Sequence, residues 1–66
     1  MAGNTRGKLK EKFEGIHRNL DWSTVHCLSA LVLIKEHNPK LTEAVESLAK
    51  GISTLDELAQ GIYGKL

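Results

Sequence analysis

The chain has 66 residues, of which 41% are hydrophobic, 26% charged and 5% aromatic, and its formal net charge is +1. This length suits one small domain and excludes a doubly wound nucleotide-binding fold or a barrel enzyme, which need far more chain. The apolar fraction is too high, and the net charge too small, for a disordered chain. We therefore expect one folded domain over residues 1–66, with residues 1–4 frayed.

The cysteine content and the apolar stretches indicate the compartment. Cys27 is the single cysteine, which excludes an intramolecular disulfide. The first residues lack the apolar core of a secretory signal. The longest apolar stretch, residues 25–34, is too short to span a bilayer, which needs about 20 residues. These features favour a reducing, cytoplasmic location and predict no membrane span.

Two helices are predicted in the first half of the chain. In residues 5–19, Leu9, Phe13 and Ile16 fall on one narrow apolar stripe that continues to Leu20. Asp21 is a good N-cap for a second helix that runs to about residue 37. On a helical wheel the apolar residues of this second helix occupy nearly every direction, which predicts burial on most sides.

Two further helices are predicted in the second half. Asn38 and Pro39 end the second helix, and they can also cap and open a third helix over residues 39–50. Gly51 is a typical C-terminal stop, and Ser53 is a suitable N-cap for a fourth helix over residues 54–64. Four helices with short linkers predict an all-α fold, a small four-helix bundle with the apolar second helix at its centre.

No pattern in the sequence indicates catalysis, a metal or a cofactor. The available zinc ligands His17, His26, Cys27 and His37 lack the close pairing of a structural site. Ser23 lies three residues before His26, but no nucleophile elbow or oxyanion motif accompanies them. No glycine lies in a phosphate-binding motif. We therefore expect a non-enzymatic protein with no cofactor, no metal and no small-molecule substrate.

The excess apolar surface of the second helix points to a protein partner. A core built from so few residues rarely supplies more than roughly 3–5 kcal/mol, so association with another chain would add needed stability. Aromatic side chains are enriched at interfaces. We predict a protein-interaction, adaptor or regulatory module that self-associates, with a homodimer as the commonest outcome. The predicted partner-binding residues are Trp22, Leu33 and Tyr63.

Nucleic-acid binding is the alternative. Residues 1–18 contain five basic and two acidic side chains, a net charge of +3 for this segment. The basic residues could contact a phosphate backbone or, bordering the apolar stripe, an anionic membrane surface. These candidates are Arg6, Lys8, Lys10, Lys12 and Arg18.

Overall fold

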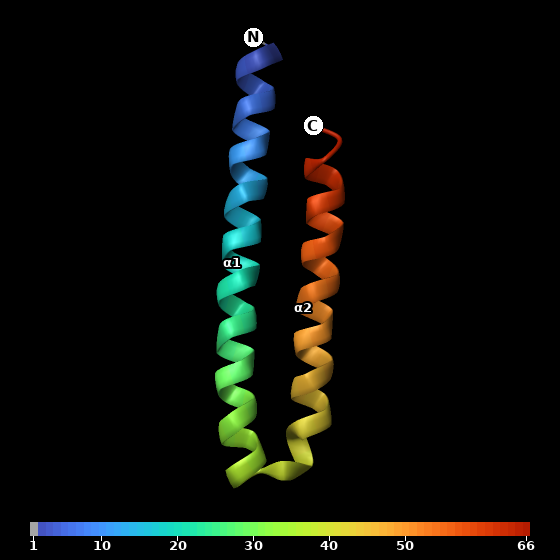
Figure 1. The fold of residues 1–66 in the computed structure, drawn as a ribbon. Coiled ribbons are helices and arrows are strands. Elements are labelled where there is room, and N and C mark those ends of the chain that lie inside the picture. The colour runs from blue at the N-terminus through green and yellow to red at the C-terminus, as the bar shows by residue number, and fades with distance from the viewer. Residues whose placement is uncertain (1) are drawn as a thin grey trace.

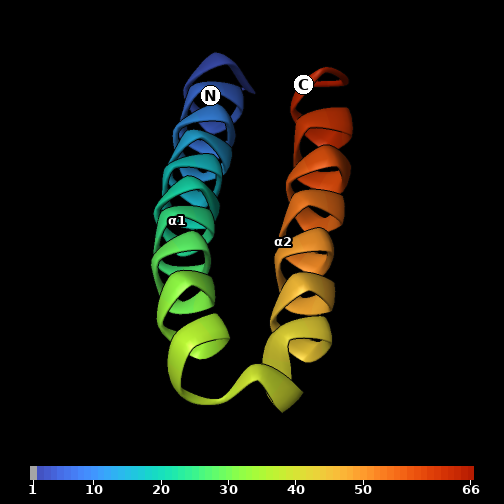
Figure 2. The ribbon, with the colours of Figure 1, turned by 60° about the horizontal axis from the view of Figure 1, so that its bottom comes forward.

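The chain folds into a hairpin of two long antiparallel helices (Figure 1). The computed structural model describes residues 2–66, and side chains from residue 5 onward. Helix α1 spans Ala2–His37, the short 3-10 helix η1 spans Pro39–Leu41, and helix α2 spans Thr42–Tyr63. The helices lie side by side in both views (Figures 1 and 2). The predicted fraying of residues 1–4 stays a prediction, because Met1 and the side chains of residues 2–4 lie outside this description.

The hairpin is long and thin. Its extents are 53 × 15 × 10 Å and its radius of gyration is 15.7 Å, whereas a compact domain of this length would have a radius of gyration of about 11 Å. Helix α1 is the longer of the two, and its N-terminal end reaches past the C-terminus of the chain (Figure 1). This shape leaves much of each helix uncovered.

The predicted four-helix bundle is wrong, because two of the predicted helix boundaries do not exist. Helix α1 continues through Asp21, where no proline or glycine interrupts it. Three residues later Thr24 donates its hydroxyl proton to the Leu20 carbonyl at 3.0 Å, a bond formed within a continuous helix. Helix α2 continues through Gly51, which does not adopt the positive φ of a helix stop. A helical glycine costs up to about 1 kcal/mol, and Ala49 and Ile52 on either side of it are half-buried.

The predicted boundary at Asn38 and Pro39 is confirmed. Helix α1 ends at His37, and Pro39 opens η1. Asn38 takes the predicted N-cap position, now of η1, but its side chain makes no capping hydrogen bond. Its backbone instead holds the turn: the Asn38 amide donates to the Ile34 carbonyl at 2.8 Å, and its carbonyl accepts from the Leu41 amide at 3.0 Å.

The two helices meet along a heptad repeat. The residues that face the partner helix are spaced alternately by three and four, which is the pattern of a coiled coil. All of them except His17 are buried or half-buried. We call this set the seam: Lys10, Phe13, His17, Leu20, Thr24, Cys27, Leu31 and Ile34 of α1, with Thr42, Val45, Ala49, Ile52, Asp56, Ala59 and Tyr63 of α2.

The prediction that residues 22–37 form a central helix, surrounded by the other helices of the chain, is also wrong. This segment packs one side on α2, while its other sides face solvent. Trp22 is 64% exposed and Leu33 58% exposed. Among the described residues only Cys27 and Ala59 are buried. One neighbouring helix can cover only one stripe, so the apolar surface of this segment stays largely uncovered.

Candidate protein-interaction surface

The heptad repeat gives the hairpin two flanks of different character. In an antiparallel pair of helices, the residues that directly precede every second seam position lie on one shared flank. In α1 these are residues 9, 16, 23 and 30, and in η1 and α2 they are residues 41, 48, 55 and 62. None of these residues is charged. A further row of α2 lies beside them and is also uncharged. We call this surface the open face: Leu9, Ile16, Ser23 and Ala30 of α1, Leu41 of η1, and Ala44, Leu48, Gly51, Leu55, Leu58 and Ile62 of α2.

The open face contains most of the exposed apolar side chains of the hairpin. Leu48 is 57% exposed, Leu55 55% and Leu58 61%. Leu9, Ile16, Leu41 and Ile62 are exposed as well. Soluble monomers rarely expose a contiguous apolar surface of such extent, and such surfaces mark interaction sites.

The opposite flank, which we call the polar flank, carries one hydrogen bond that links the two helices. Farther along α1 the same flank also exposes three apolar side chains: Val25, Leu28 and Val32. The Tyr63 hydroxyl donates to Oε2 of Glu14 at 3.0 Å. Nζ of Lys10 lies 5.7 Å from the centre of the Tyr63 ring, within the range of a cation–π contact. The hydrogen bond to Glu14, together with its negative charge, raises the pKa of Tyr63. The residues Glu14 and Gln60 line one open hollow of about 400 Å³, which places both of them on this flank as the repeat predicts.

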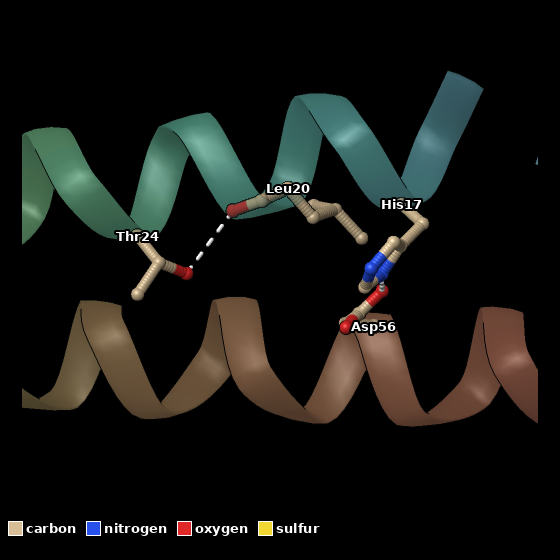
Figure 3. A network of polar contacts seen from close by, with 4 residues as sticks. All are labelled: His17, Leu20, Thr24 and Asp56. Carbon is tan, nitrogen blue, oxygen red and sulfur yellow. Dashed lines mark hydrogen bonds and ion pairs between the residues drawn. The ribbon is translucent and has the colours of Figure 1, made fainter. Parts of the chain in front are cut away.

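His17 and Asp56 form the polar contact inside the seam. Figure 3 shows the His17 ring on α1 meeting the Asp56 carboxylate on α2, with Leu20 and Thr24 following along α1. The distance from Nδ1 to Oδ1 is 2.8 Å. The hydrogen bond and the charge of Asp56 raise the pKa of His17. This pair was not predicted, because nothing in the sequence places these two residues opposite each other before the register of the hairpin is known.

The candidate nucleophiles and metal ligands do not assemble into a site. Ser23 donates its hydroxyl proton to the Asn19 carbonyl at 2.9 Å, and Cys27 is buried in the seam. The ring of His26 faces that of Trp22, with centroids 6.0 Å apart. In the described part of the chain, no three His, Cys, Asp or Glu side chains lie close enough to hold a metal ion.

The three predicted partner-binding residues do not lie together. Trp22 and Leu33 share the outer edge of α1, three helical turns apart, and both are exposed. Tyr63 lies in the seam near the end of α2, hydrogen-bonded to Glu14. Their contact with a partner stays a prediction.

The five basic candidates are spread around α1. Lys10 lies at the seam beside Tyr63, and Arg18 lines the hollow on the polar flank. Helical spacing places Lys8 and Lys12 on the opposite side, near the open face, and Arg6 on the part of α1 that extends past α2. The structure therefore does not collect these cations on one face. For residues 2–66, neither long helix is apolar enough over a sufficient length to cross a membrane.

The open face was also missed as a unit, although its signal is present in the sequence. Leu41, Leu48, Leu55 and Ile62 recur every seven residues. This spacing runs across Gly51, where the sequence predicts a helix end, and a predicted break there hides the repeat.

Comparison with protein-family models, curated proteins and solved structures finds no match to this chain.

Proposed function

We propose that this chain is a small non-enzymatic protein-interaction module that self-associates through its open face. The observation that carries the proposal is the uninterrupted, uncharged and exposed apolar surface along the whole of α2. Apolar area removed from water contributes about 25 cal/mol per Å², so covering this face by a protein surface is favourable.

The small core of the hairpin supports the same proposal. Only Cys27 and Ala59 are buried among the described residues, and neither has a large side chain. A two-helix hairpin of this kind has little apolar packing of its own. Association would therefore stabilise the fold as well as cover the open face.

Sedimentation equilibrium over a concentration series tests the proposal. We expect the parent chain to associate as its concentration rises, and Leu48→Glu to shift this transition to higher concentration because a carboxylate would have to leave water. Ser53→Glu is the matched control, since it adds the same charge to α2 on the polar flank. A parent chain that stays monomeric at every concentration would refute the proposal. Circular dichroism on each variant checks that the helices persist.

A further inference from the structure

We propose that a second copy of this chain covers the open face, with α2 of each copy packed antiparallel on α2 of the other across a two-fold axis at Gly51. This inference rests on the proposed function and adds the orientation and the register of the two copies. It follows from the pattern of α2, from its charges and from the surface area that the hairpin exposes.

Helix α2 carries a second heptad seam beside the one that packs on α1. Leu41 at its N-terminal end and the open-face residues of α2 follow one another at spacings of three and four, as in the first seam. A shallow groove lies over the middle of this row, lined by Leu48, Gly51 and Leu55. A Cβ built on Gly51 would meet nothing within 4 Å, so the backbone is open to a close neighbour there.

Helix α1 does not offer a comparable row on the same side. The corresponding positions of α1 include Lys12, Asn19, Ser23 and His26. Polar side chains in the middle of a contact must be desolvated, which opposes association. The continuous apolar row of α2 therefore belongs at the centre of the interface, and α1 at its border.

The second seam is complementary to itself when it is reversed. A two-fold axis at Gly51 sets Leu48 against Leu55 of the second copy, and Leu41 against Ile62 of the second copy. The same axis sets the small Ala44 against the large Leu58 of the second copy, and glycine against glycine at the centre. The Ala44–Leu58 pairs set small side chains against large ones, and the facing glycines leave room for the backbones to approach at the centre. An isologous contact of this kind closes as a dimer.

The charges of α2 also permit this contact. Helix α2 holds four acids and one base, so two copies each carry −3 and would repel if these side chains faced each other. Helical spacing turns Glu43, Glu46, Lys50 and Glu57 to the side away from the second seam. The positions that border it on the outer side are Ser47, Thr54 and Gly61, which are uncharged.

The chain exposes more surface than a compact monomer of its mass. The chain exposes 5266 Å², whereas a compact monomer of 7.3 kDa exposes about 4,200 Å². The excess is about 1,100 Å² per copy, and it includes side chains outside the open face, such as Trp22 and Val32. A stable interface takes roughly 600–1,000 Å² from each copy, so the exposed excess leaves room for one on the open face.

Spin labels at the turn of the hairpin test the orientation. The label is attached through Lys40→Cys in a Cys27→Ala background, whose association is first compared with that of the parent. Position 40 lies eleven residues from Gly51, so antiparallel packing separates the two labels by about 33 Å along the helices. A two-fold axis parallel to the helices would instead bring both turns to one end, with the labels within about 20 Å.

The outcomes of this experiment separate the two proposals. Dimers with the long distance support the antiparallel α2 contact. Dimers with the short distance overturn the contact and leave the self-association standing. A labelled protein and a parent that are both monomeric overturn both proposals.

A charge pair introduced across the axis tests the register. Leu48→Glu alone is expected to weaken dimerisation about tenfold or more. Adding Leu55→Lys in the same chain restores most of it, because each new carboxylate then faces a new ammonium group of the second copy. Within one helix the two positions lie about 10 Å apart, too far to pair directly.

The matched control is Leu48→Glu combined with Ile62→Lys, which introduces the same two charges. In the proposed register position 62 faces position 41 of the second copy, so the new lysine does not face the new glutamate. It should not restore dimerisation. Equal recovery in the two double variants, or recovery in neither, overturns the register. Helix content measured on all variants shows whether the hairpin itself is retained.

Discussion

Nδ1 of His17 on α1 lies 2.8 Å from Oδ1 of Asp56 on α2, so a hydrogen-bonded pair joins the two helices inside the seam. Both residues occupy positions where a coiled coil usually has apolar side chains. A slip of one helix along the other would break this hydrogen bond, whose two side chains are 47% and 29% exposed. The pair therefore favours the one register in which these two residues meet.

The stability of the hairpin should depend on pH through this pair. Asp56 raises the pKa of His17 above its ordinary value of 6.5, so the folded chain binds the proton more tightly than the unfolded chain. The resulting stabilisation is fully present below pH 6.5 and is lost as the pH rises through the raised pKa. Urea unfolding across this range should show a decline that Asp56→Asn reduces. Identical pH profiles for the two proteins would contradict the prediction.

Enlarging Ala59 should destabilise the seam. Ala59 is 8% exposed at the contact of the two helices. Ala59→Phe would push the helices apart or force strained side-chain conformations, and overpacking of this kind costs about 1–3 kcal/mol. Denaturant unfolding measures the loss. Glu57→Leu, on the exposed back of the same helix, should leave the free energy of unfolding nearly unchanged. Equal losses in both variants would show that Ala59 does not lie at a packed contact.

Replacing Gly15 should stabilise the chain. Gly15 lies inside α1, and a Cβ built on it would meet only the Arg18 guanidinium, at 4.0 Å. Gly15→Ala is therefore expected to raise the free energy of unfolding by up to about 1 kcal/mol. Gly64→Ala is the control, because Gly64 lies just beyond the end of α2. A lower thermal midpoint for Gly15→Ala would mean that this surface needs the space a glycine leaves.

Association should depend more on the open face than on the outer edge of α1. Leu55→Ala is expected to raise the dimer dissociation constant about tenfold, because a central apolar contact is lost. Trp22→Ala should have a smaller effect, since side chains at the border of an interface contribute little. Sedimentation of both variants measures the difference. A larger effect of Trp22→Ala would place the contact on the outer edge of α1.

The chain should show little affinity for nucleic acid. Its five N-terminal basic side chains point in several directions around α1 and give no continuous positive face. Titration of short duplex and single-stranded DNA at two salt concentrations is expected to show no salt-dependent binding. Salt-dependent binding that is lost on Lys8→Ala combined with Lys12→Ala would establish the alternative function.

The sequence alone determined the helical character of the chain and the turn at Asn38 and Pro39. Both depend on local chemistry: apolar residues recur with helical spacing, and proline restricts its predecessor and lacks an amide proton. These effects act within a few residues and need no knowledge of the rest of the fold.

Only the tertiary structure decided whether the chain turns at Asp21 and Gly51, and which apolar stripe is covered. Capping and glycine signals are worth about 1 kcal/mol each, so burial along a long interface outweighs them. That burial joins residues far apart in the sequence, such as Cys27 with the seam residues of α2. The pairing of His17 with Asp56, and the exposure of Leu48 and Leu55, follow from the resulting register and not from local sequence.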